Sequence, residues 1–205
     1  NDTVLSLASV YSIIIFNSLA FQQSSIYLKI FNILISLEII EKLLNAIFNK
    51  DIVSKKSEIL IKAASILDLP VILTEQYPKG LGDTVLSIKD SLKENFKFYE
   101  KTSFSALQND IVKQAIKDED KKQIIIFGIE THICVNQTVS ELIDLGYEVF
   151  VVVDACGSRK QVEHNAGIDR IKEYGAHLVT TEIVLFELLK TAQHPKFKEI
   201  QSLIK

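Results

Sequence analysis

The sequence has no methionine and only two cysteines among its 205 residues. Cys134 and Cys156 each follow an apolar run that is typical of a buried strand. This usage differs from the disulfide framework of small secreted proteins, so we expect a reducing, cytoplasmic setting. The chain begins with Asn1, and the missing methionine indicates processing or a sequence other than the plain translation product.

The sequence also lacks an excess of positive charge. Its formal net charge is −3, its isoelectric point is near 5.9, and like charges do not gather in blocks. A nucleic-acid-binding domain is expected to carry a basic patch, so we predict no nucleic-acid partner. The histidines show no paired spacing with carboxylates that would make a metal site, so we predict no metal and no cofactor.

Charged residues are absent from residues 3–28, and residues 4–21 form an apolar stretch of about the length that spans a bilayer. However, Asp2 stands where a signal peptide carries basic residues, and several Ser, Asn and Gln side chains dilute the stretch. Two interpretations stay open. We favour residues 1–31 as an apolar appendage, packed on the domain or on a partner subunit, over a membrane contact through residues 3–28.

From residue 32 onward, apolar runs alternate with helical patterns. The runs predict strands at 33–37, 70–74, 97–100, 123–127, 147–153 and 176–180. Helical spacing predicts helices at 39–47, 52–67, 85–95, 105–117, 131–146, 162–174 and 184–191, and a loop rich in Pro and Gly covers 75–82. This order predicts one α/β domain over residues 32–205, with a parallel sheet between two helical layers and function at the carboxyl ends of the strands.

Cys134 stands at or just inside the start of a predicted helix that follows the strand at 123–127. Unpaired N–H groups and the helix dipole at such a place lower the pKa of a thiol and can hold an oxyanion. The sequence therefore favours a nucleophile at this position as much as a buried structural cysteine, and both interpretations stay open.

A carboxylate and an amine also lie near predicted strand ends. Glu38 follows the first strand, and Lys101 follows the strand at 97–100, so both are expected to face the same crevice as Cys134. Glu38 could take the thiol proton and return it to a leaving amine, while Lys101 could stabilise the thiolate and the substrate oxygen. An ordinary ion pair near a loop is the alternative.

Several motifs resemble the isochorismatase-like cysteine hydrolases. The resemblance rests on residues 128–135 (GIETHICV), 152–155 (VVDA) and 158–159 (SR). Residues 74–82 (TEQYPKGLG), 100–105 (EKTSFS) and 194–205 are similar to the branch called isochorismatase domain-containing proteins. The resemblance covers the chain from about residue 32 to its end.

The resemblance implies a three-layer α/β fold and a triad of Cys134, Lys101 and an acid. The family usually has Asp at the acid position and Gln two residues later, where this chain has Glu38 and Ile40. Glu adds a methylene, and a shift of about 1 Å in a catalytic group can cost about a hundredfold in rate.

The resemblance also implies further features of the site. It places a cis peptide bond at Ile129–Glu130, an oxyanion hole at the backbone N–H groups of Cys134 and of Glu130 or Thr131, and His132 in the turn rather than as a base. The residues expected to line the substrate pocket are Tyr77, Phe104 and Thr138. The Asp-x-His arrangement of metal-binding nicotinamidase-type members is absent, and relatives commonly form oligomers, so we expect a homo-oligomer.

The leading hypothesis is a cytoplasmic cysteine hydrolase that cleaves a small amide, carbamoyl or related C–N substrate through a covalent acyl-enzyme. Hydrolysis of a vinyl ether is less favoured, because members that perform it do not depend on a nucleophilic cysteine. A second hypothesis, motivated by Glu38 and Ile40, is a catalytically impaired binding or scaffold protein. A third is a redox-sensing thiol, which requires Cys156 within disulfide reach of Cys134.

Overall fold

The computed structural model describes residues 33–92 and 98–205. The predicted appendage at residues 1–31, and with it the membrane contact considered for residues 3–28, lies outside these residues. In the described part of the chain, no helix combines the length and apolar character that a membrane crossing requires.

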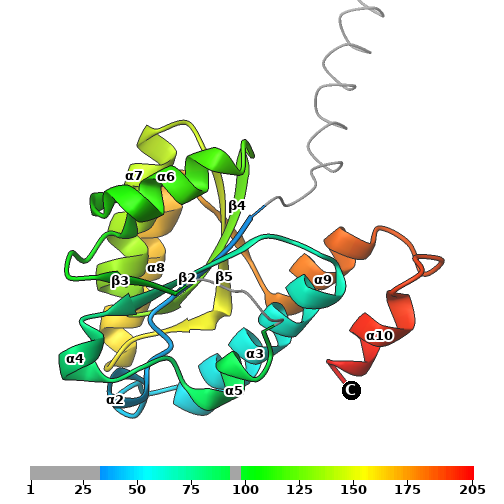
Figure 1. The fold of residues 1–205 in the computed structure, drawn as a ribbon, viewed down its shortest axis with the longest axis horizontal. Coiled ribbons are helices and arrows are strands. Elements are labelled where there is room, and N and C mark those ends of the chain that lie inside the picture. Colours follow the sequence, from blue (N-terminus) through cyan, green and yellow to red (C-terminus); the bar gives the residue numbers. More distant parts are fainter. Residues whose placement is uncertain (1–32, 93–97) are drawn as a thin grey trace, which may run out of the picture. The chain divides into compact units, whose positions relative to one another are not determined.

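A six-stranded parallel sheet forms the middle layer (Figure 1). In spatial order its strands are β3 (Phe98–Lys101), β2 (Val71–Gln76), β1 (Ile33–Leu37), β4 (Gln123–Ile129), β5 (Glu148–Gly157) and β6 (His177–Val179). Both central strands, β1 and β4, are buried along their whole length. The chain order reverses between these two strands, and the carboxyl edge at such a reversal is where open α/β sheets bind ligands.

Helices cover both faces of the sheet, which confirms the predicted three-layer α/β fold (Figure 1). One face carries α3 (Lys50–Ile66), α5 (Leu86–Lys89) and α9 (Thr181–Leu189), and the other carries α6 (Asp110–Asp118), α7 (Asn136–Asp144) and α8 (Gln161–Glu173). The shorter elements are α2 (Glu41–Leu44), α4 (Pro78–Leu81), η2 (Ala106–Gln108), the π-helical turn η3 (Thr131–Val135) and α10 (Phe197–Ser202).

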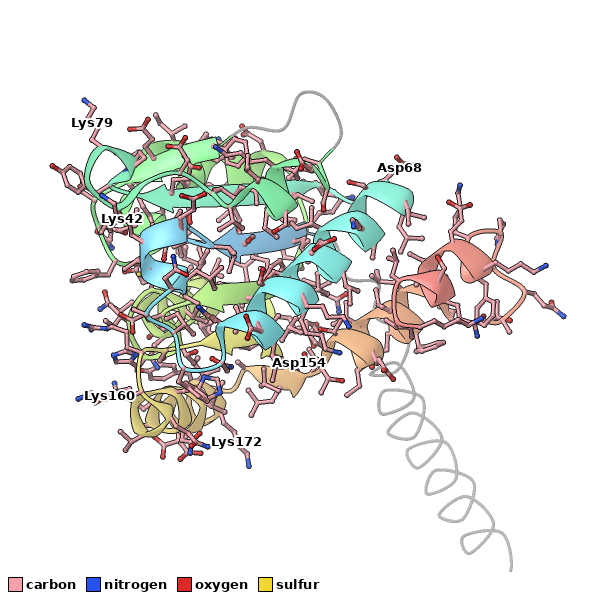
Figure 2. All side chains as sticks on the ribbon, turned by 90° about the horizontal axis from the view of Figure 1, so that it is seen from below. Lys42, Asp68, Lys79, Asp154, Lys160 and Lys172 are labelled. Carbon is pink, nitrogen blue, oxygen red and sulfur yellow. The ribbon has the colours of Figure 1, made fainter. Side chains whose placement is uncertain are left out.

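The apolar core lies between the sheet and these helices. The β4 residues Ile124, Ile125, Ile126 and Phe127 are all fully buried, as expected for a strand covered on both faces. Charged side chains such as Lys79, Lys160 and Lys172 are exposed and extend from the outside of the fold (Figure 2). A buried charge in this fold is therefore an exception that needs a specific partner.

Several strands run past the ends that their sequence patterns predict. β4 continues to Ile129 and β5 to Gly157, and the extension of β2 bears on the site. β2 continues past Thr74 through Glu75 and Gln76, which pair in register with Glu100 and Lys101 of β3. The predicted loop at 75–82 therefore begins at Tyr77 and includes α4. The pattern ended early because Glu75 and Gln76 are polar, yet both are buried at the edge where the functional residues gather.

Several helices also differ from their predicted bounds; for example, α2 covers only Glu41–Leu44 of the predicted 39–47. The helix predicted at 85–95 is the short α5, and residues 93–97 lie outside the described part of the chain. The sequence pattern does not predict α10, whose buried Ile200 packs in a small apolar cluster with residues of α3 and α9. A helix of six residues is too short for its spacing to be distinctive.

Candidate active site

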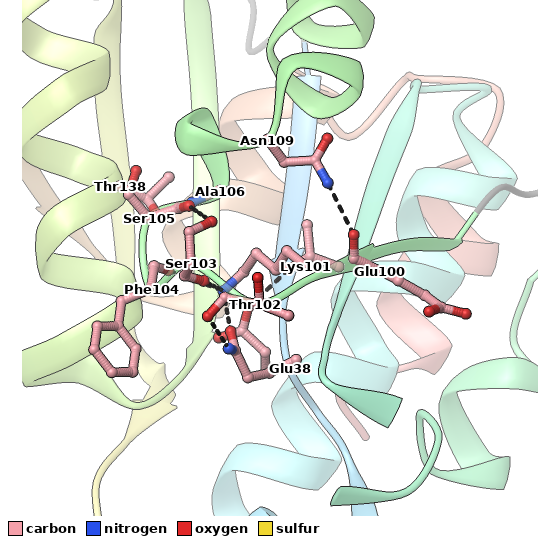
Figure 3. Close-up of polar contacts among 12 residues, drawn as sticks. Glu38, Glu100, Lys101, Thr102, Ser103, Phe104, Ser105, Ala106, Asn109 and Thr138 are labelled. Atoms are coloured by element: carbon pink, nitrogen blue, oxygen red, sulfur yellow. Dashed lines mark hydrogen bonds and ion pairs between the residues drawn. The ribbon is translucent and has the colours of Figure 1, made fainter. Parts of the chain in front are cut away.

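The candidate site is assembled at the carboxyl edge of the sheet, where β1 and β4 separate. Glu38 directly follows β1, Lys101 is the last residue of β3, and Cys134 lies in η3, just after β4. β2 stands between β1 and β3 in the sheet, so its last residues lie between Glu38 and Lys101. Figure 3 shows the contacts of Lys101 with Glu38 and with the segment that follows β3.

Glu38 and Lys101 form a buried ion pair. Glu38 Oε1 lies 2.7 Å from Lys101 Nζ, and both side chains have an exposed fraction of 0%. Thr74 Oγ1, from β2, donates a further hydrogen bond of 2.9 Å to the same carboxylate oxygen. The other oxygen, Glu38 Oε2, is buried without a hydrogen-bond partner among the described residues. The carboxylate therefore has one oxygen committed to its neighbours and one available as a proton acceptor.

The surroundings of Glu38 act on its pKa in opposite directions. Burial raises the pKa of this carboxyl above its ordinary value, while the charge of Lys101 and the polar interactions with Lys101, Cys134 and Thr74 lower it. The net shift is upward. A base with a raised pKa is a stronger proton acceptor than an exposed carboxylate, and this property suits general-base catalysis.

Cys134 is nearly buried, with 6% of its surface exposed. Burial raises the pKa of its thiol well above the ordinary value, and the negative charge of Glu38 raises it further. Lys101 and a backbone hydrogen bond from Glu130 oppose this shift without reversing it. The lowered thiol pKa predicted from the helix start is therefore wrong, because desolvation and the adjacent carboxylate outweigh the backbone N–H groups. At neutral pH the thiol carries its proton, and its activation requires a base.

The turn that carries Cys134 is tied to the end of β5 and to α8. Thr131 Oγ1 donates to Gly157 O at 3.0 Å and lies 2.9 Å from His164 Nδ1. His132 Nδ1 lies 3.0 Å from Ser158 Oγ, which agrees with its expected place in the turn. The peptide bond at Ile129–Glu130 is cis, as the family resemblance predicted.

Glu130 places its backbone and its side chain in different surroundings. Its backbone forms a hydrogen bond with the Cys134 thiol, whereas its carboxylate accepts hydrogen bonds from the backbone N–H and the Nε of Arg159, each at 3.0 Å. A cavity of about 240 Å³ beside this turn is lined by His132, Arg159, Lys160 and Glu163. The predicted oxyanion donors at Glu130, Thr131 and Cys134 thus belong to one turn, and their role stays a prediction.

The residues predicted to line the substrate pocket lie in different surroundings. Thr138 is fully buried, and its Oγ1 accepts the N–H of Ala106 at 3.0 Å (Figure 3). It therefore holds the segment after β3 in place instead of facing an open pocket. Tyr77 and Phe104 are about half exposed, at 54% and 55%, and their contact with a substrate stays a prediction.

Sequence reasoning missed two polar residues of β2 that contact the ion pair. Thr74 bonds Glu38, and Gln76 Oε1 accepts from Lys101 Nζ at 2.6 Å. The signal was present in the sequence, since Thr74, Glu75 and Gln76 directly follow an apolar strand. The apolar pattern ends the predicted strand at Thr74 and places Gln76 in a loop, which gives no reason to expect its side chain against Lys101.

A metal centre was not expected, and among residues 33–92 and 98–205 no group of three or more His, Cys, Asp or Glu side chains could hold a metal ion. The absence of a metal and a cofactor stays a prediction. The chemistry that these residues support without further groups is proton transfer and nucleophilic attack at one buried edge.

A parallel three-layer fold that brings a cysteine, a carboxylate and a lysine together at the carboxyl edge of its sheet defines a class of α/β protein, the isochorismatase-like fold. The isochorismatase domain model matches residues 32–183. This chain therefore belongs to the isochorismatase family.

Known proteins show the same relationship. Isochorismatase domain-containing protein 2 of Xenopus laevis is 45% identical over 159 residues, which cover 77% of this chain and 75% of that protein. The MAR1 ribonuclease structure from Caenorhabditis elegans is 38% identical, with a TM-score of 0.81 and coverage of 85% of this chain and 89% of that chain.

Two further structures have lower sequence identity. YcaC from Pseudomonas aeruginosa, described with hexane-2,5-diol and covalent acrylamide, has a TM-score of 0.78 at 26% identity and covers 84% of this chain and 88% of its own. YcaC from Escherichia coli, described as an octameric hydrolase of unknown specificity, has a TM-score of 0.75 at 25% identity and covers 84% and 92%.

Proposed function

We propose that this chain is a cysteine hydrolase that cleaves a small amide, carbamoyl or related C–N bond through a covalent acyl-enzyme. The observation that carries the proposal is the buried Glu38–Lys101 pair of 2.7 Å, whose second carboxylate oxygen has no partner among the described residues. The same carboxylate interacts with the thiol of Cys134. A protonated thiol next to a basic carboxylate is the starting arrangement for base-assisted attack.

The first half-reaction forms the acyl-enzyme. Cys134 Sγ attacks the substrate carbonyl carbon while its proton passes to Glu38, and backbone N–H groups of Cys134 and of Glu130 or Thr131 bind the oxygen that becomes negative. The intermediate then collapses with cleavage of the C–N bond. Glu38 returns its proton to the leaving nitrogen, which departs as an amine or ammonia, and a thioester remains on Cys134.

The second half-reaction releases the acyl group. A water molecule attacks the thioester carbonyl, and Glu38 takes one of its protons. Collapse of this intermediate breaks the C–S bond, and Glu38 returns the proton to the departing thiolate. The products are a carboxylic or carbamic acid and the free thiol. Between these proton transfers, the positive charge of Lys101 favours the ionised form of Glu38.

The departures from the family pattern do not remove these contacts. Glu38 reaches Lys101 and Thr74 at hydrogen-bond distance despite its extra methylene. Ile40 is fully buried and forms an antiparallel bridge with Thr84, so this position supplies packing instead of an amide. The retained contacts of Glu38 favour the enzyme over the binding or scaffold protein. That alternative gains support if Cys134 proves inert toward small electrophiles.

Three of the similar structures are named as ribonucleases, which motivates a comparison with RNA as a substrate. This chain has a formal net charge of −3, and the side chains of Glu38 and Lys101 are completely buried. A polynucleotide usually requires a positive surface that tracks its phosphates. We therefore favour a small molecule as the substrate and propose no nucleic-acid partner.

The test is a panel of small amides and carbamoyl compounds incubated with the purified chain, quenched in acid and analysed by intact-mass spectrometry. We expect a substrate that releases ammonia or an amine and leaves an acyl adduct on Cys134. Cys134→Ala should abolish both signals, whereas Cys156→Ala, the matched control, should retain them. Turnover that persists in Cys134→Ala, or cleavage of single-stranded RNA without turnover of any amide, would contradict the proposal.

Two coarser features complete the proposal. We infer a homo-oligomer, supported by the octameric assembly described for the Escherichia coli neighbour, and a cytoplasmic location, supported by two buried, unpaired cysteines.

The thiol of Cys156 is fully buried, and burial raises its pKa to about 12. A thiol with these properties is a poor resolving partner, so the redox-sensor hypothesis receives no support.

A further inference from the structure

The ammonium of Lys101 has more acceptors than protons. Four oxygens lie within hydrogen-bond distance of Nζ: Gln76 Oε1 at 2.6 Å, Glu38 Oε1 at 2.7 Å, Ser103 O at 2.8 Å and Phe104 O at 2.9 Å. An ammonium group has three N–H donors and no acceptor. Protein oxygens therefore saturate it, and it has no N–H left for a thiolate or a substrate oxygen.

Gln76 is oriented by a bond at each end of its amide. Its Nε2 donates to Thr102 O at 2.7 Å, so its Oε1 faces Lys101. Gln76 lies opposite Lys101 in the β2–β3 register. The Gln76 amide thus connects Lys101 both to the end of β2 and to the segment after β3. Two carbonyl groups of that segment are further acceptors for the ammonium (Figure 3).

We propose that Gln76 is a positioning residue of this site, which holds the Lys101 ammonium against Glu38 and so restricts it to acting through that carboxylate. This inference rests on the proposed role of Glu38 as the base. It assigns Lys101 no direct contact with the reacting oxygen, which leaves the oxyanion to backbone N–H groups. Lys101 is therefore not expected to stabilise the substrate oxygen, which was one of the two roles predicted for it from the sequence.

A neutral amide suits this position better than either close alternative. An apolar side chain would leave Thr102 O without its donor and would remove the acceptor through which β2 holds the ammonium. A carboxylate would compete with Glu38 for the ammonium, and its like charge would raise the pKa of Glu38. The titratable groups that act on Glu38 are Lys101, from β3, and the thiol of Cys134, from η3. A change at Gln76 is therefore expected to reach the thiol through Glu38.

The experiment measures the rate of Cys134 alkylation by acrylamide as a function of pH, in the full chain, with Cys134→Ala as the blank. If Glu38 is the base, the rate falls at low pH, where Glu38 becomes protonated. We call this part of the pH–rate profile the acidic limb. Gln76→Met should weaken the hold of Lys101 on Glu38 and move this limb to higher pH, with about a tenfold lower rate on the limb. Gln76→Glu, which preserves the size of the side chain, should also move it upward.

The matched control is Gln123→Met. Gln123 is another buried glutamine, at 7% exposure. It is the first residue of β4, at the opposite end of the strands from the site, and its Nε2 donates a hydrogen bond to Glu148. Its loss should affect stability without moving the limb. The inference is overturned if folded Gln76→Met and Gln76→Glu both keep the wild-type limb while Glu38→Gln removes it. If Glu38→Gln itself leaves the limb in place, the proposed function fails instead. Should Gln76→Met not fold, the isosteric Gln76→Glu decides.

Discussion

Glu38→Gln is expected to lower the rate of Cys134 alkylation at neutral pH by about a hundredfold or more, the usual contribution of a general base. The substitution keeps the size of the side chain and removes its ability to accept the thiol proton. Burial holds the thiol pKa well above its ordinary value, so little thiolate forms without a base. The measurement is the pseudo-first-order rate of acrylamide addition, followed by mass spectrometry.

The chain offers a closely matched control for this variant. Glu75 is a second buried carboxylate at the same sheet edge, with 8% exposure, and it accepts the backbone N–H of Thr84 at 2.8 Å. Glu75→Gln should leave the alkylation rate within about a factor of three, since a base contributes only where it can reach the proton. Equal rates in wild type, Glu38→Gln and Glu75→Gln would show that Glu38 does not activate the thiol.

Gly128→Ala is expected to have the largest effect on folding, a loss of about 3 kcal/mol or more of unfolding free energy. Gly128 is the sixth residue of β4 and has φ +131°, a conformation that residues with a Cβ rarely adopt. A methyl group there would lie 2.0 Å from Leu37 O and 2.8 Å from Leu37 N. These are backbone atoms of a central strand, so the clash cannot be relieved by a side-chain rotation.

The comparison for this prediction is Gly146→Ala. Gly146 also has positive φ, at +82°, but an added Cβ would meet nothing within 4 Å, so only the backbone cost of about 1 kcal/mol is expected. Urea unfolding followed by circular dichroism gives both values. If the two variants lose similar stability, the close approach of β4 to β1 beside Glu38 is not as tight as described.

The strands of this protein could be predicted because most are short, uninterrupted apolar runs. The run at 123–127 lies within β4, and the run at 33–37 coincides with β1. Their carboxyl ends indicated Glu38 and Cys134 before any contact was known, because a parallel sheet collects such ends at one edge. The sequence could not predict which hydrogen bonds these side chains make, since Thr74 and Gln76 come from another strand.

The protonation of the site was the least predictable feature. A helix start lowers a thiol pKa, and this local rule was applied to Cys134. The shift in the folded chain has the opposite sign, because burial and the charge of Glu38 come from tertiary packing. Thr138 shows the same limit. Its motif position suggested a pocket, but the packing of the segment after β3 against α7 buries it completely.

The central claim is that Glu38 and Cys134 act as one unit, with the carboxylate as the base for the thiol. The most direct test is the pH–rate profile of Cys134 alkylation in the wild-type chain. The pKa of Glu38 is raised above 4.5 and that of Cys134 above 9.0. Between these two pKa values the reactive form exists, with the carboxylate ionised and the thiol protonated. The account predicts a rise through the carboxyl pKa, a plateau between the two pKa values and a second rise only when the thiol itself ionises. A single tenfold increase per pH unit from acidic to alkaline pH, without a plateau, would contradict it.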